Sequence, residues 1–203
     1  MAPPDDGTLA EWGTQMHLAK EDPTKAADPW LTWMEPHRDR LWPAGLGRHE
    51  VSWAYCCRTG AIDVMDGDGD KDEWKDAQGP TTVTGTTDWW GQLPAGEPWV
   101  DDLKTGWVQP GLTTAQMLMY LLVAVRSTGA THGRVSVTHW RRGELQPERR
   151  WQQIGPATLD NFETELRLAW QKAAAGPSPR PGSWCRYCPS ATICPAVTGK
   201  DTE

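Results

Sequence analysis

The chain has 203 residues and a formal net charge of −7. This length is sufficient for one well-packed domain, and no Pro/Gly/Ser-rich linker divides it into halves that could each fold alone. The negative charge disfavours binding of nucleic acid through bulk electrostatics but does not exclude catalysis. Residues 1–12 are acidic without an apolar core, and the apolar run at 117–125 is too short to cross a bilayer, so we expect a cytoplasmic protein with no membrane partner.

The predicted elements are typical of an α/β protein. Four stretches are predicted as helices from apolar periodicity and capping residues: 9–20, 29–41, 114–127 and 159–175. Five stretches bounded by turn residues are predicted as strands: 49–55, 61–65, 82–88, 99–104 and 133–140. Thr113 is the predicted N-cap of the third helix. We therefore expect a central mixed sheet flanked by helices, in a single domain spanning residues 1–203.

Acidic residues upstream of the central stretch are interpreted as surface features. Glu50 begins the first predicted strand, and we favour an exposed strand-end carboxylate over a further acid near a site. Asp66–Glu73 resembles a calcium-binding loop. The spacing fails, because a loop that starts at Asp66 has Lys71 where it needs glycine and Ala77 where it needs a bidentate glutamate. We interpret this run as a solvated acidic hairpin tip.

The stretch Gly85–Gly106 contains the residues with the clearest chemistry. Side chains alternate along a strand, so Asp102 and Lys104 share one face, and a hairpin can bring Asp88 beside them. Two converging carboxylates bind a hard divalent cation such as Mg²⁺. A nearby lysine can steady an attacking water or the charge that grows on a phosphate. This combination is typical of a phosphodiesterase.

Four short motifs follow one another along the chain: Gly13–His17, Gly85–Asp88, Asp102–Gly106 and Gln116–Tyr120. Each alone is weak, because a D-x-K pattern often arises by chance, but the ordered set is specific. The set resembles the RecB-like branch of the PD-(D/E)XK nuclease superfamily, which includes CRISPR-associated and phage-encoded exonucleases. The resemblance extends over residues 10–196.

The resemblance implies a restriction-endonuclease-like core and a metal-dependent DNA exonuclease of bacterial or phage recombination or repair, in a bacterial cell or phage-infected host. Asp88, Asp102 and Lys104 are the implied catalytic residues. Asp88, Asp102 and the main-chain carbonyl of Leu103 would hold Mg²⁺ or Mn²⁺, with His17 as an additional ligand. Lys104 would orient the attacking water or stabilise the transition state.

Gln116 and Tyr120 are four residues apart, so they share one helix face. The resemblance implies that they line the site and help to place the DNA strand, whereas a core tyrosine bonded by a glutamine is the alternative. Two other functions use the same fold. One is a catalytically silent protein that binds nucleic acid or a partner, and the other is an endonuclease or resolvase.

Because the net charge is negative, any DNA contact must be local. The basic residues gather in the second half of the chain: Arg126, His132, Arg134, Arg141, Arg142, Arg149 and Arg150.

A Cys-rich tail occupies residues 183–197. Its cysteines have C-x2-C-x5-C spacing: Cys185, Cys188 and Cys194. In a cytosolic protein such clustering favours metal ligation over disulfides. The resemblance implies a structural [4Fe–4S] cluster with one further, upstream cysteine, and zinc is an alternative. The fourth ligand is open: Cys56 or Cys57 could supply it, a missing N-terminal segment could have supplied the family's usual upstream cysteine, or the tail holds no cluster.

Overall fold

The protein is described by a computed structural model. The described residues are 9–21, 24, 34, 36–38, 40–43, 45–65, 81–105, 111–141, 146–176 and 194. The chain separates into two compact units, Met1–Thr164 and Glu165–Glu203. The prediction of one nuclease domain with a Cys-rich tail stays a prediction.

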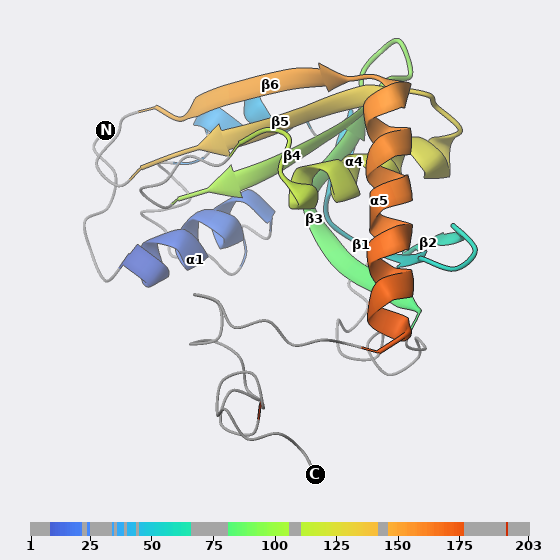
Figure 1. Ribbon diagram of the computed structural model, residues 1–203. Helices are drawn as coiled ribbons and strands as arrows, with labels where there is room; N and C mark the ends of the chain where they lie inside the picture. Colours follow the sequence, from blue (N-terminus) through green and yellow to red (C-terminus); the bar gives the residue numbers. More distant parts are fainter. Residues whose placement is uncertain are drawn as a thin grey trace. The chain divides into compact units, whose positions relative to one another are not determined.

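The described strands of the first unit form a six-stranded sheet in the order β2-β1-β3-β4-β5-β6 (Figure 1). Their bounds are β1 Gly47–Cys56, β2 Ile62–Val64, β3 Thr82–Gln92, β4 Pro98–Lys104, β5 Gly133–His139 and β6 Glu148–Ile154. β4 and β5 are parallel, whereas the other neighbouring pairs are antiparallel. A parallel pair needs a crossover connection, and a helix provides it here. The mixed sheet with flanking helices confirms the predicted fold class.

That crossover helix is α4 (Ala115–Thr128), and it covers one face of the sheet. Nine consecutive residues of α4, Met117–Val125, are buried. Gly133 at the start of β5 permits the close approach, because a Cβ there would lie 2.7 Å from the Leu121 side chain. The helix is capped by Thr114, whose hydroxyl accepts the amide proton of Met117. The predicted cap, Thr113, is therefore wrong by one residue.

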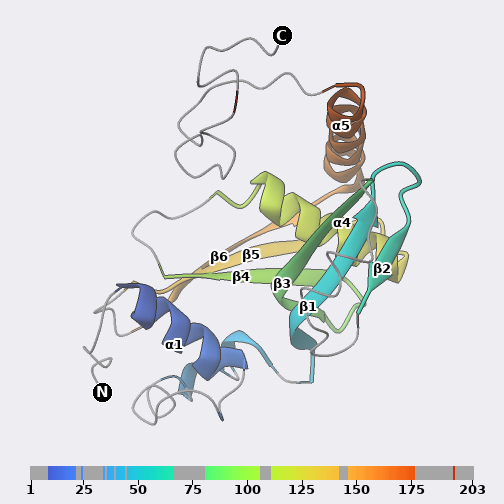
Figure 2. The ribbon, with the colours of Figure 1, turned by 90° about the horizontal axis from the view of Figure 1, so that it is seen from below.

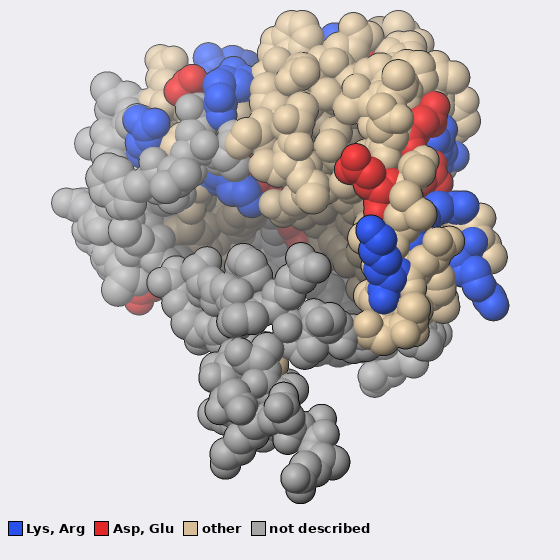
Figure 3. Space-filling model, viewed as in Figure 1, with Lys and Arg blue, Asp and Glu red and all other residues tan. Residues whose placement is uncertain are grey.

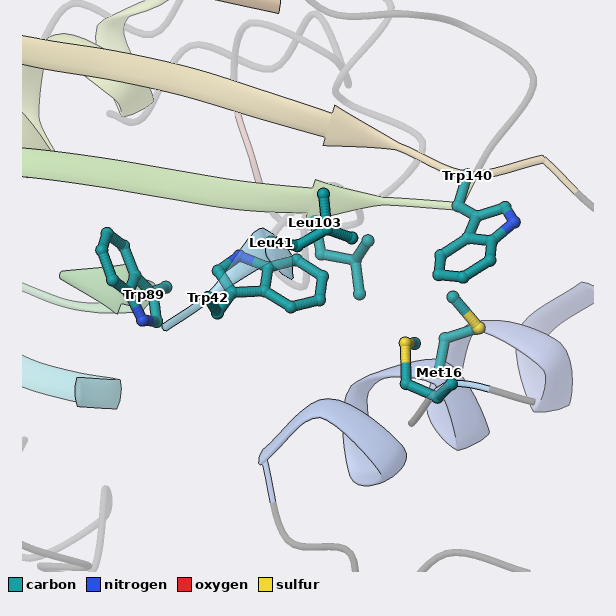
Figure 4. Packing of buried hydrophobic residues seen from close by; sticks show 7 residues of the cluster. Met16, Leu41, Trp42, Trp89, Leu103 and Trp140 are labelled. Atoms are coloured by element: carbon teal, nitrogen blue, oxygen red, sulfur yellow. The ribbon is translucent and has the colours of Figure 1, made fainter. Parts of the chain in front are cut away.

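The opposite face packs against α1 (Leu9–Glu21) and against the described residues Met34, Leu41 and Trp42 (Figure 2). We call the buried residues between them the tryptophan cluster, which consists of Met16, Met34, Leu41, Trp42, Trp89, Leu103 and Trp140. Figure 4 shows Met16 of α1 below Trp140, the residue after β5, and Leu103 of β4 beside Leu41. Three of its seven members are tryptophans, whose large rings bury much apolar surface.

The observed strands differ from the predicted ones mainly at β3 and β6. β3 does not end at Asp88 but continues to Gln92, since Trp89 packs in the tryptophan cluster and pairs with β4. β6 was not predicted at all. It is an edge strand whose residues are mostly polar, so it lacks the alternation that indicates a half-buried strand.

The last helix, α5 (Pro156–Ala174), crosses the boundary between the two units. Within the first unit, Glu163 accepts a hydrogen bond from the Tyr55 hydroxyl at 2.7 Å. Arg126 of α4 donates to Glu163 at 2.8 Å and to Asp160 at 2.6 Å. These bonds fix the start of α5 against β1 and α4.

Candidate active site

β4 presents two neighbouring aspartates to opposite faces of the sheet, as the alternation predicts. Asp101 is fully buried on the side of the tryptophan cluster. It accepts hydrogen bonds from Trp42 at 2.7 Å, from Thr138 at 2.9 Å and from Ser136. Arg149 lies 3.4 Å from the same carboxylate and is largely buried, so its charge is directed into the protein.

Asp102 and Lys104 point to the α4 face. Lys104 Nζ lies 2.7 Å from Asp102 Oδ2. The aspartate side chain is only 1% exposed, whereas the lysine is 34% exposed. A buried carboxylate is therefore paired with an ammonium group that reaches solvent. The prediction that these two side chains share one face is confirmed.

Asp88 lies where the ladder between β3 and β4 stops. The paired register ends with Trp89 opposite Asp101, so Asp88 and Asp102 occupy the next row. In that row the Asp88 carboxylate accepts the amide proton of Leu103 at 2.8 Å. A side chain thus takes a position that a backbone carbonyl fills elsewhere in the ladder. The two strands separate here, and both carboxylates lie at the opening.

Glu50 extends this row onto β1. β1 and β3 pair on both sides of Glu50 and Asp88, which places the two acids opposite one another. Glu50 is half-buried and has a φ of 49°, the left-handed region that non-glycine residues rarely adopt. The prediction of an exposed strand-end carboxylate is wrong. The strand begins three residues earlier, at Gly47, and tertiary pairing positions the side chain beside the site.

The side chains of β3 also change the face of the sheet to which they point at this row. Thr87 accepts a hydrogen bond from Trp53 at 3.0 Å, and the Trp53 ring packs against Tyr120 of α4. Two residues further along β3, Trp89 lies in the tryptophan cluster on the opposite face. In a regular strand these two side chains would share a face. Asp88, between them, lies at the irregularity.

His17 of α1 completes the group. Its Nδ1 lies 4.0 Å from Asp88 Oδ2. One ligand atom each from His17, Glu50 and Asp88 can be chosen so that all three lie within 4.8 Å of one another. An imidazole nitrogen and two carboxylates form a donor set that suits a divalent cation such as Mn²⁺. The residues present therefore fit a metal ion.

Comparison with known proteins identifies the family of this site. The sequence profile described as the PD-(D/E)XK nuclease superfamily matches residues 3–195. The chain belongs to the PD-(D/E)XK nuclease superfamily. The chain is also similar to the solved crystal structure of SSO0001, with 17% identity, coverage of 93% of this chain and 70% of that one, and a TM-score of 0.44. No curated protein matches it.

Membership of a nuclease superfamily implies a nucleic-acid substrate, phosphodiester hydrolysis and divalent metal ions. Glu50, Asp88 and Asp102 lie in one row across β1, β3 and β4, which we call the carboxylate row. This row, the neighbouring His17 and the four sequence motifs all lie within the matched residues. Within the described part of the chain, no helix is both long and apolar enough to cross a lipid bilayer.

Gln116 and Tyr120 bring α4 into the site of this nuclease-superfamily chain. Gln116 Nε2 donates to the Tyr120 hydroxyl at 2.7 Å and lies 3.5 Å from Asp102 Oδ1, the long limit for a hydrogen bond. Burial raises the pKa of Tyr120 to about 12, and the neighbouring carboxylates add to the rise against the Gln116 hydrogen bond. The tyrosine therefore keeps its proton near neutral pH, and a hydroxyl that accepts one bond can still donate another.

The pKa of Asp102 is strongly perturbed. Burial, together with the charge of Asp88, raises the pKa of Asp102 to about 6, although Lys104 opposes the rise. A carboxylate with this pKa exchanges its proton close to physiological pH. Such groups cluster at functional sites, because catalysis uses environments that disfavour the resting charge.

Two of the described basic residues of the second half are paired with acids. Arg126 is paired with Asp160 and Glu163, and Arg134 lies 3.4 Å from Glu97. On the face shown in Figure 3, described basic and acidic side chains are interspersed.

Several predicted features lie outside the described residues: the acidic run Asp66–Glu73, Arg142, and the tail cysteines Cys185 and Cys188. Cys194 is half-buried in the second unit. In the first unit Cys57 is buried, whereas Cys56 is half-buried at the end of β1. Hydrogen bonds from Thr59 lower the pKa of Cys56 to about 7.

Proposed function

We propose that the chain is a divalent-metal-dependent DNA exonuclease of the RecB-like branch, acting in bacterial or phage recombination or repair. One observation supports this proposal most directly. Asp88 of β3 and both Asp102 and Lys104 of β4 lie together where the pairing of the two strands ends. The order of the four motifs along the sequence supports the RecB-like branch and the exonuclease activity.

The carboxylate row holds the metal ion in this proposal. Asp88, Asp102 and the carbonyl of Leu103 are ligands, and His17, near Asp88, is an additional one. When bound, a divalent ion acts as a Lewis acid toward the phosphoryl group. The burial of Asp102 strengthens its attraction to a cation, because little water competes there.

Lys104 has the position that a phosphodiesterase needs. Its ammonium is anchored by Asp102 at 2.7 Å and remains one-third exposed, so it can approach a scissile phosphate from the solvent side. There it orients the attacking water or stabilises the negative charge that grows on the phosphate. Tyr120 and Gln116 place the DNA strand, since the neutral tyrosine hydroxyl can donate to a phosphate oxygen.

The tail cysteines Cys185, Cys188 and Cys194 hold a structural [4Fe–4S] cluster in this proposal, with zinc as the alternative metal. Cys56 or Cys57 stays the candidate for a further ligand, as the sequence predicts. Iron and zinc analysis of the purified protein, with Cys56→Ser and Cys57→Ser variants compared, tests this assignment.

The activity is tested with end-labelled linear DNA, single- and double-stranded, beside a closed circle. Each substrate is incubated with Mg²⁺ or Mn²⁺, with a chelator, and with the Lys104→Ala variant. Loss of linear but not circular DNA, abolished by the chelator and by Lys104→Ala, is the expected result. Cleavage of the circle supports an endonuclease or resolvase instead. DNA that is bound but uncut by folded, metal-loaded protein supports the binding-only function.

A further inference from the structure

Glu50 has a conformation that its own sequence does not explain. It lies inside β1 with a φ of 49°, although glutamate has no intrinsic preference for the left-handed region. Such a conformation persists only when the surrounding structure enforces it, and it recurs at functional sites. Its effect here is local: residues on either side remain paired with β3, while Glu50 departs from the regular pleat.

The location of Glu50 brings carboxylates from neighbouring strands together. Its carboxylate is half-buried directly across from Asp88, and like charges opposite one another in a sheet destabilise the pair. Asp102 continues the row on β4, so three acids occupy adjacent strands at one level. Lys104 forms an ion pair with Asp102, at the other end of the row. A divalent cation between Glu50 and Asp88 would attract both carboxylates.

The distances fit such an ion. Ligand atoms of His17, Glu50 and Asp88 lie within 4.8 Å of one another. Opposite ligands of an octahedral ion with bonds of about 2.1 Å are roughly 4.2 Å apart, so small side-chain rotations bring the three atoms into range. The three residues come from α1, β1 and β3. β1 and β3 are paired, and Met16 of α1 lies in the same buried cluster as Trp89 of β3.

We propose that Glu50 is a ligand of the divalent ion in the nuclease site, so that His17, Glu50 and Asp88 hold the ion on the β1 side of the carboxylate row. This inference rests on the proposed metal dependence and deepens it. The mixed donor set favours Mn²⁺ over Mg²⁺, because imidazole is a better ligand for transition metals than for Mg²⁺. Glu50 replaces neither Asp102 nor Lys104 and shares the ion with Asp88.

Binding of Mn²⁺ to the full chain, measured by electron paramagnetic resonance without DNA, tests the role of Glu50. The variants are Glu50→Gln, Glu50→Gly and the control Asp63→Asn, which removes an exposed acid from the neighbouring strand β2. We expect both Glu50 variants to weaken Mn²⁺ binding by at least about tenfold, the scale on which even outer-shell partners alter metal affinity. Asp63→Asn should bind as the wild type does.

Glu50→Gly separates a ligand from a structural residue. Glycine accepts a positive φ without strain, so the metal-free melting temperature of this variant should equal or exceed that of the wild type while its Mn²⁺ affinity falls. Mn²⁺ affinity equal to that of Asp63→Asn in both Glu50 variants overturns the inference and leaves the proposed function intact. A wild-type protein that binds no Mn²⁺ and cuts no DNA removes the proposed function itself.

Discussion

Asp101 and Asp102 are neighbours in the sequence, yet their surroundings differ in nearly every respect. Asp101 receives hydrogen bonds from three side chains and pairs with a buried arginine. Asp102 is just as buried, but it contacts one partly exposed lysine and one distant amide. The first environment satisfies the negative charge, whereas the second leaves it ready to bind a cation. Burial alone therefore does not distinguish a structural aspartate from one that is available to bind a cation. The number of hydrogen-bond donors around the carboxylate does.

The largest effect is expected for Asp102→Asn. A metal ligand at the reacting phosphate contributes several kcal/mol to transition-state stabilisation, so cleavage should fall by roughly a thousandfold. The metal-free variant should be as stable as the wild type or more stable, because the substitution removes a charge whose ionisation burial opposes. Cleavage rates and thermal unfolding without metal are the measurements. Normal cleavage by Asp102→Asn would show that the site is elsewhere.

Asp101→Asn should lower the stability of the protein while leaving cleavage by the folded molecules intact. The substitution leaves Arg149 buried without its anionic partner, and breaking a buried pair in this way costs about 3 kcal/mol. Denaturant unfolding measures this loss, with Asp63→Asn as the control. Molecules that remain folded should still cleave DNA. An unchanged unfolding midpoint would mean that the three neutral donors suffice to fix Asp101.

A third effect concerns pH. The pKa of Asp102 is raised from 3.8 to about 6, so protons compete with the metal ion below that pH. Mn²⁺ affinity should fall by up to about tenfold per pH unit below pH 6, and Asp102→Asn should flatten this part of the profile. For the metal-free protein the sign is reversed. The raised pKa contributes stability that is present at low pH and is lost as pH rises through about 6. Metal titrations and melting curves across this range test both statements.

The smallest effect is expected for Tyr120→Phe. The substitution removes one hydroxyl that can hold a phosphate oxygen, a loss of about 1 kcal/mol or roughly fivefold. Because the role is placement, KM for DNA should rise more than kcat falls. Gln116→Ala should behave similarly, since Gln116 bonds Tyr120. A thousandfold fall in kcat for Tyr120→Phe would contradict the placement role.

Much of this comparison was predictable from the sequence, because strand alternation is a local property. The alternation placed Asp102 and Lys104 on one face and Asp101 on the other, and the periodicity of α4 placed Gln116 beside Tyr120. The roles of these residues in catalysis stay predictions.

The rest depends on tertiary structure that no local pattern encodes. Glu50 comes beside Asp88 through the register of β1 on β3 and through a backbone conformation that glutamate does not favour. β3 extends beyond Asp88 because Trp89 packs against residues from α1 and β4. β6 escaped prediction because an edge strand needs little apolar surface. The spacing of the acids in sequence, about 38 residues between Glu50 and Asp88, gave no signal of their proximity.

The hydrogen bond between the Leu103 amide and Asp88 has a consequence for spectroscopy. The proton on this amide faces a carboxylate rather than a peptide carbonyl, so its resonance frequency and its rate of exchange with deuterium depend on the charge that Asp88 carries. A proton or a cation that arrives at Asp88 changes both quantities without any movement of the backbone. The backbone amide signal of Leu103 can therefore report, in the absence of DNA, whether Asp88 carries a proton or a cation.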